Sequence, residues 1–208
     1  MELKIYKLTP ERLGDYLWFF ENVAHSDNPI WAICYCLDYC SEPNAGVDLS
    51  DNAVKRQMAI DYVNRGAIQG YLAYYEGRVV GWCNANRKAD CMECMGWAEE
   101  IGPEARNSVQ DVKSVFCFTV DPAMRGKGIA EALLRRVIAD AAGEGYSVIE
   151  GYPNKGESDM YYSYVGPLAL YEKLGFSITG ETRRGYIVRK NLQNDAVTIV
   201  QNEEARNV

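Results

Sequence analysis

The chain has 208 residues, of which 48% are hydrophobic and 25% are charged. This length suits one large domain with a buried core, and this composition excludes disorder or a collagen repeat as a description of the whole chain. Lys and Arg number 22 against 29 Asp and Glu, and the net charge of -7 disfavours general nucleic-acid binding, which depends on neutralising phosphates. No apolar run of about 18 residues is present that could span a membrane. The first residues lack an apolar signal segment and the cysteines number seven, so we expect reduced thiols and a cytoplasmic protein.

The first half of the chain predicts a short strand, two helices and a hairpin. Leu3 to Leu8 alternate in polarity like a strand, and Thr9 and Pro10 can start a helix that runs to about Val23. The remaining elements of this half are a helix over residues 50–64 and two hairpin strands over 71–75 and 78–84.

The second half alternates strands with helices, which is typical of an α/β sheet. The expected order is a central strand over 112–120, a helix over 126–142, a strand over 146–152, a helix over 167–174, and closing strands over 177–181 and 186–189. Because the first half supplies an antiparallel hairpin, the sheet is predicted to be mixed. We expect a single domain over residues 1–193, with insertion-like segments at about 25–48 and 87–110, and a C-terminal tail over 194–208.

A glycine-bearing turn before the 126–142 helix is the most informative segment. Gly126 and Gly128 lack Cβ atoms, so an anion can approach the backbone, where the free N–H groups and the dipole of the helix attract negative charge. Arg125 and Lys127 add formal positive charge beside the same point. The spacing is neither that of a Walker loop nor that of the dinucleotide fingerprint, and an ordinary strand-to-helix turn is the alternative interpretation.

Two motifs in this half resemble those of the GNAT superfamily of N-acetyltransferases. Arg125-Gly-Lys-Gly-Ile-Ala130 is similar to its R/Q-x-x-G-x-G/A motif, and Leu170-Tyr-Glu-Lys-Leu-Gly-Phe176 is similar to its later L-Y-E-K-x-G-F segment. The segments 150–153 and 164–167 are similar to those of a little-characterised bacterial subgroup. The resemblance implies a mixed, mostly antiparallel sheet flanked by helices, with two central strands that splay apart.

The resemblance also implies acetyl-CoA as the co-substrate. Its diphosphate would lie on the backbone amides of the turn, and its pantetheine arm would lie between the splayed strands. The residues expected to hold it are Phe118, Thr119, Val120, Arg125, Gly126, Lys127, Gly128, Ile129 and Ala130. The family often has Asn and Ala where this chain has Tyr164 and Pro167, which puts one cofactor contact in doubt.

By the same resemblance, Tyr171 is the expected general acid for the departing thiolate, and packing beside Phe176 is its alternative role. Glu150 is the candidate base, with a surface or ion-paired role as the alternative. His25, Asp27 and Glu93 are weaker candidates, for which we expect surface positions.

Cysteine spacing offers a further interpretation. Cys34, Cys36 and Cys40, together with Cys91 and Cys94, could be zinc ligands, but the irregular spacing favours reduced thiols, and we expect no metal.

The sequence therefore predicts a cytoplasmic acetyltransferase that moves the acetyl group of acetyl-CoA to a primary amine. The acceptor would be a small molecule or a peptide, with no nucleic-acid or membrane partner, and a homodimer is left open. The alternatives are a transferase that uses another acyl-CoA or acylates a hydroxyl, and a non-catalytic CoA-binding sensor.

Overall fold

The computed structural model describes residues 2–28, 33–44, 46–96, 101, 111–156 and 164–192. These residues form one seven-stranded sheet in the order β1-β2-β3-β4-β5-β7-β6, in which β4 and β5 are parallel and the other neighbours are antiparallel. Its strands are β1 Lys4–Lys7, β2 Gly70–Tyr75, β3 Arg78–Arg87, β4 Val112–Val120, β5 Val148–Gly151, β6 Ser177–Glu181 and β7 Tyr186–Asn191. The predicted mixed, mostly antiparallel sheet is confirmed. The predicted tail over 194–208 lies outside the described residues, and so do residues 97–100 and 102–110 of the insertion-like segment predicted at about 87–110.

The main helices are α1 Leu13–Asn22, α2 Asn52–Asn64, α3 Ile129–Gly143 and α4 Leu168–Lys173. A 3-10 turn over Pro10–Arg12 precedes α1, and Thr9 makes no side-chain cap bond, which corrects the cap expected there. Asp51 caps α2, because its side chain accepts from the amides of Ala53 and Val54. No described helix is both long and apolar enough to cross a membrane.

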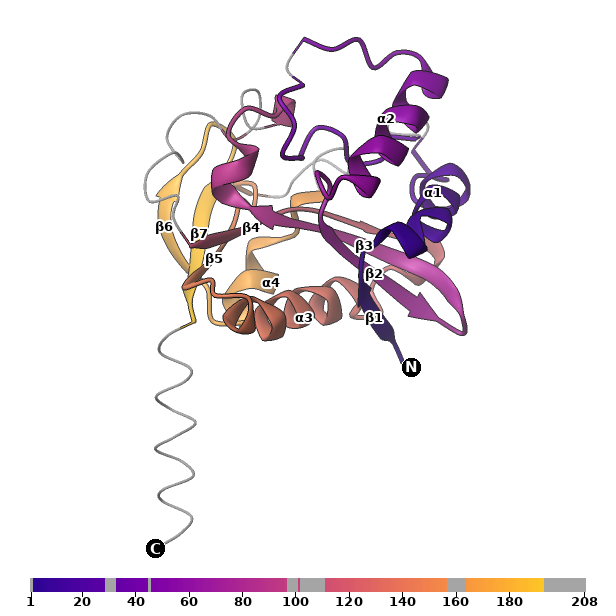
Figure 1. The fold of residues 1–208 in the computed structure, drawn as a ribbon. Helices are drawn as coiled ribbons and strands as arrows, with labels where there is room; N and C mark the ends of the chain where they lie inside the picture. Colours follow the sequence, from indigo (N-terminus) through magenta and orange to yellow (C-terminus); the bar gives the residue numbers. More distant parts are fainter. Residues whose placement is uncertain are drawn as a thin grey trace, which may run out of the picture.

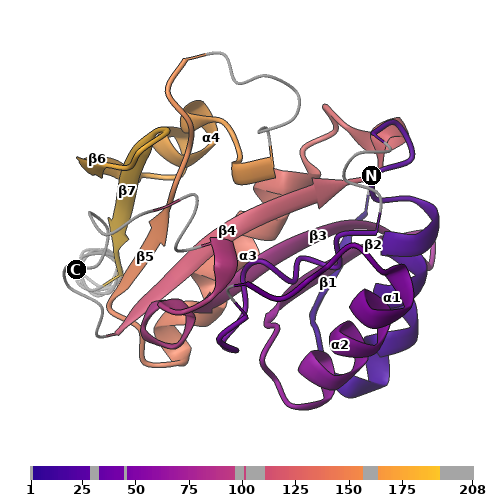
Figure 2. The same cartoon turned by 90° about the horizontal axis from the view of Figure 1, so that it is seen from above.

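Helices cover both faces of the sheet. Figure 1 shows α1 and α2 on one side and α3 with α4 on the other, and Figure 2 shows the same sheet from above. The first face buries aromatic side chains such as Tyr16, Phe19 and Trp82 beneath α1, α2 and the segment 35–40. The second buries Leu133, Val137 and their neighbours between α3 and the sheet. The apolar face of the amphipathic helix α3 therefore packs on the sheet.

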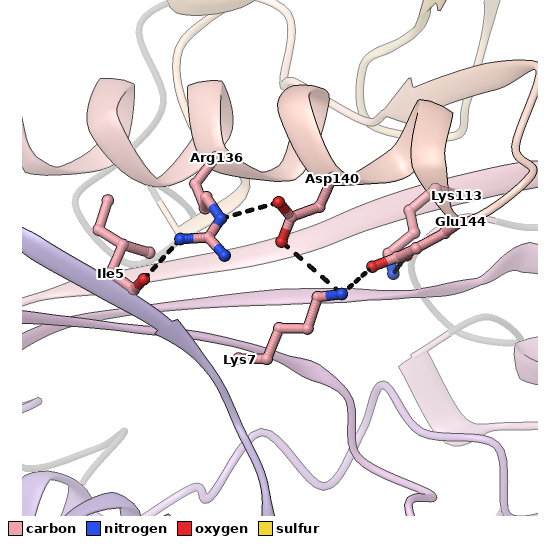
Figure 3. Close-up of polar contacts among 6 residues, drawn as sticks. All are labelled: Ile5, Lys7, Lys113, Arg136, Asp140 and Glu144. Carbon is pink, nitrogen blue, oxygen red and sulfur yellow. Dashed lines mark hydrogen bonds and ion pairs between the residues drawn. The ribbon is translucent and has the colours of Figure 1, made fainter.

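Polar contacts fix α3 on the sheet (Figure 3). Arg136 donates to the carbonyl of Ile5 at 2.9 Å and pairs with Asp140 at 2.9 Å. Glu144, just past the C-terminal end of the helix, accepts from Lys113 of β4 at 2.7 Å and pairs with Lys7 of β1. These contacts join the C-terminal half of the helix to strands on two parts of the sheet.

The two central strands separate. Pairing between β4 and β5 covers only Val112 to Val115, whereas β4 itself continues to Val120. At the same place the register between β3 and β4 shifts, so that Asn84 faces Cys117 and Ala85 faces Val115. Such a bulge bends the strand and increases its twist. The predicted splay is therefore present, and it leaves the last residues of β4 with an edge that no described strand pairs.

Candidate functional site

A cavity of about 240 Å³ lies at the end of β4, beside the turn that opens α3. Four stretches distant in sequence complete its wall: residues 24–28, 34–39, 95–96 and 164–167. The lining residues on which the interpretation depends are His25, Asp27, Cys34, Asp38, Tyr39, Phe118, Thr119, Val120, Arg125, Ala130 and Tyr164. One side of the cavity is thus strand edge and helix start, and the other is loop.

The turn before α3 is open. Gly126 and Gly128 have φ of +73° and +81°, and a Cβ built at either position would meet nothing within 4 Å. Among the described residues, the first backbone bond of this helix runs from Ala132 N–H to Gly128 C=O, and no side chain caps the helix. The N–H groups of the first turn are therefore available to an anion, as the anion-binding interpretation requires.

The predicted donor-site residues gather here. Phe118, Thr119, Val120, Arg125 and Ala130 line the cavity. The other four, Gly126, Lys127, Gly128 and Ile129, form the turn and the start of α3. The Lys127 ammonium donates to the carbonyl of Ala123 at 3.1 Å, which holds its charge close to the turn. The open turn therefore adjoins the cavity, with Arg125 before it and Ala130 after it in the cavity wall.

Tyr171 lies behind the cavity wall at the point where the strands separate. Its ring packs against Gly151, where any Cβ would come within 2.4 Å of it, and Phe118 meets it edge to face. Its hydroxyl donates to the carbonyl of Val165 at 2.9 Å. Burial raises the pKa of the Tyr171 phenol well above its usual value, so the group keeps its proton at neutral pH. Packing against Phe176 is also present, at 5.3 Å between ring centroids.

Glu150 is completely buried and fully hydrogen-bonded. Its Oε1 accepts from Lys88 Nζ and Tyr152 Oη, both at 2.7 Å, and its Oε2 accepts from Arg189 Nε at 2.6 Å. Burial lowers the pKa of the Lys88 ammonium, while Glu150 opposes that shift. Glu150 is not among the residues that line the cavity. In this arrangement its carboxylate ties β5, β7 and the 3-10 turn Lys88–Cys91 together.

Two of the weaker candidates line the cavity instead. His25 is half-buried, not at the surface as expected, and its Nε2 lies 3.3 Å from Cys34 Sγ. Burial, and next the charge of Arg125, lower the pKa of His25 to about 4. Asp27 forms a bidentate ion pair with Arg125, which lowers the pKa of its carboxyl. Glu93 is exposed and does not line the cavity.

The loop side of the cavity is held by contacts that the sequence does not announce. Asn84 of β3 is buried and donates to the carbonyl of Tyr39 at 2.7 Å. The Tyr39 ring stacks on Phe116 at 5.1 Å, and Phe116 stacks on Tyr152 in turn. Ile33, Tyr35 and Cys36 have positive φ, which ordinary residues adopt only under constraint. A polar Asn within an otherwise apolar strand was the available signal for this anchoring.

All seven cysteines are free. Cys83 and Cys117 are buried in strands, where they pack as small hydrophobic core residues. Within the described part of the chain, no group of three or more His, Cys, Asp or Glu residues could hold a metal ion.

Comparisons with known proteins agree on one family. A family model described as an acetyltransferase (GNAT) domain matches residues 67–178. An N-acetyltransferase structure from Staphylococcus aureus is similar, with 17% identity over 92% of this chain and 99% of that one and a TM-score of 0.52. A ribosomal-protein-alanine N-acetyltransferase structure from Brucella melitensis has 18% identity over 91% of this chain and 99% of that one, with a TM-score of 0.52. The structure of an acetyltransferase from Salmonella typhimurium with its cofactor acetyl-CoA has 14% identity over 91% of this chain and 94% of that one, with a TM-score of 0.51. At these identities the structural likeness shows the fold alone, and no curated protein matches the chain.

Proposed function

The chain belongs to the GNAT family of acetyltransferases, and from that premise we propose that it moves the acetyl group of acetyl-CoA to a primary amine by direct attack. One observation carries the proposal: the turn at Gly126 and Gly128 is open at the start of α3, and it follows a strand edge that no described strand pairs. A diphosphate needs the first feature, and an extended amide-bearing arm needs the second.

The residues present fit coenzyme A. The amides from Gly126 to Ala130 would hold the diphosphate, since both glycines leave the space that its oxygens need. The free edge of Phe118 to Val120 would hydrogen-bond the pantetheine arm as an added strand. Arg125 and Lys127 supply positive charge at the same place. When bound, the thioester supplies an activated acetyl carbonyl that an amine can attack.

Tyr171 is the proposed general acid. It holds a proton at the point where β4 and β5 separate, and its raised pKa keeps the phenol protonated until the thiolate departs. Its hydroxyl must leave the carbonyl of Val165 to do so, and that exchange involves one neutral hydrogen bond.

The base has two candidates. Glu150, the predicted one, does not line the cavity, and its buried carboxylate is surrounded by its own donors. His25 has the more direct position, since it lines the cavity; its low pKa leaves it neutral at pH 7 but makes it a weaker base than a free imidazole. The two roles are separable, because loss of a base lowers kcat whereas loss of the buried network first lowers stability.

The experiment is calorimetric titration with acetyl-CoA followed by release of free CoA thiol in the presence of a panel of amines. Binding with amine-dependent thiol release supports the proposal. Binding without release from any amine supports the sensor alternative, and release that depends on an alcohol supports hydroxyl acylation. Absence of binding refutes the proposal. A location in the cytoplasm is proposed on the seven free cysteines.

A further inference from the structure

Arg125 and Asp27 form an ion pair across the cavity, and both side chains line it. The guanidinium contacts both carboxylate oxygens, with Nη2 at 3.1 Å from Oδ1 and Nη1 closer still to Oδ2. Arg125 directly precedes the open turn at Gly126, while Asp27 follows α1 on the opposite wall. The pair therefore connects the donor half of the cavity to its loop half.

The ion pair between Arg125 and Asp27 can be broken at a small cost in free energy. The side chains of Arg125 and Asp27 are 46% and 35% exposed, and exposed ion pairs contribute little to stability. A diphosphate on the adjacent turn carries more negative charge than one carboxylate and also faces the positive end of α3. It would therefore compete with Asp27 for the guanidinium.

Release of Asp27 would change the charge of the loop half. The charged residues that line the cavity, among those described, are Asp27, Asp38 and Arg125, while the low pKa of His25 leaves it neutral. With Arg125 on the diphosphate, Asp27 loses its cation, and its carboxylate leaves negative charge on the loop half. Tyr39 and Tyr164 line the same wall, and their ring faces also attract cations.

A carboxylate that bound the reacting ammonium itself would raise the pKa of that group and suppress the neutral amine that attacks. A second positive group on the acceptor has no such drawback. We propose that Asp27 binds a cationic group of the acceptor other than the reacting amine, and that Arg125 frees Asp27 for this when the diphosphate of the donor binds. The substrate class is then a diamine or polyamine. This inference rests on the proposed function.

Donor binding alone tests the exchange. Asp27→Asn leaves Arg125 without its competing carboxylate, so calorimetry with CoA should give a dissociation constant about two- to fivefold lower than that of the wild type. The matched control is Asp48→Asn, which removes the same charge from an exposed loop and keeps an oxygen for the amide of Ser50. The control should leave the constant unchanged. If the CoA dissociation constant of Asp27→Asn is equal to or higher than that of the wild type, the proposed exchange is refuted.

A matched pair of substrates tests the acceptor class. The wild type should acetylate 1,4-diaminobutane with a kcat/KM at least about tenfold above that of butylamine, which lacks only the second ammonium. Asp27→Asn should remove this preference through KM, with kcat for both amines within about threefold, and Asp48→Asn should retain it. Equal wild-type values for the two amines overturn the inference, as does a preference that survives in Asp27→Asn.

Different results refute the proposed function and the diamine inference. The proposed function and the inference are both refuted if the wild-type protein binds no CoA, or if none of the amines tested makes it release free thiol. A wild-type protein that acetylates a peptide but neither alkylamine refutes only the diamine class. A collapse of kcat in Asp27→Asn would make Asp27 the base and would overturn its binding role.

Discussion

A methyl group at Gly128 tests the donor site directly. This residue precedes α3 with φ of +81°, and a Cβ there meets no atom within 4 Å, so Gly128→Ala adds backbone strain but no clash. An L-residue in the left-handed region costs roughly 1–2 kcal/mol, and the free energy of unfolding should fall by about that amount. The methyl group would occupy the space proposed for the diphosphate oxygens. Loss of one charge-assisted hydrogen bond there, worth about 1.5–3 kcal/mol, would weaken CoA binding at least about tenfold.

The chain offers a matched control at the other end of the same helix. Gly145 has φ of +87° and equally open space around a built Cβ, so Gly145→Ala should lose the same stability. The assay is calorimetry with CoA, combined with urea unfolding of both variants. Only Gly128→Ala should bind more weakly. Unchanged affinity in Gly128→Ala, or an equal loss in Gly145→Ala, would refute the placement of the diphosphate on this turn.

Three further predictions concern the chemistry and stability of the site. Tyr171→Phe should lower kcat about 100-fold or more at nearly unchanged CoA affinity. The control Tyr74→Phe, which loses the hydroxyl bond from Tyr74 of β2 to the Asp15 carboxylate of α1, should keep its activity, and equal turnover in Tyr171→Phe removes the acid role. Lys88→Met leaves Glu150 without its buried cation and should lower the free energy of unfolding by about 3 kcal/mol in urea; a loss below about 1 kcal/mol would contradict this pairing. The pKa of His25 falls from 6.5 in the unfolded chain to about 4 in the folded one, so its contribution to stability is present above pH 6.5 and is lost as the pH falls towards 4. Relative to His25→Gln, the wild type should lose at most about 3 kcal/mol of its free energy of unfolding over that window. Parallel plots of this free energy against pH for the two proteins would show that the shift is absent.

The framework of the fold could be predicted because its signals are local. The strand over 112–120 is found with the predicted bounds, since a mostly apolar stretch ends there at Asp121 and Pro122. The helix after it was expected from Gly126 but begins at Ile129, because both glycines of the turn take positive φ and lie outside the helix. β5 is shorter than expected, since its pairing with β4 stops at Gly151 beneath the Tyr171 ring.

The loop side of the site could not be predicted, because its contacts are distant in sequence. His25 was expected at the surface but lines the cavity, where the segment carrying Cys34 folds over it. That segment is placed by the bond from Asn84 to the carbonyl of Tyr39, across 45 residues of chain. No periodicity or spacing around residue 34 announces such a contact.

This difference follows from which atoms each half of the cavity uses. The donor half presents backbone amides, and close approach to them requires glycine at fixed positions, so a motif appears in the sequence. The loop half presents side chains such as Asp38 and Tyr39, and neither is part of the turn or of the β4 edge, although the Tyr39 ring stacks on Phe116 of β4. Replacement of these two side chains, as in Asp38→Asn and Tyr39→Leu, should therefore alter the choice among amines while the CoA dissociation constant stays within about twofold. Parallel loss of both properties would show that the two halves are not built independently.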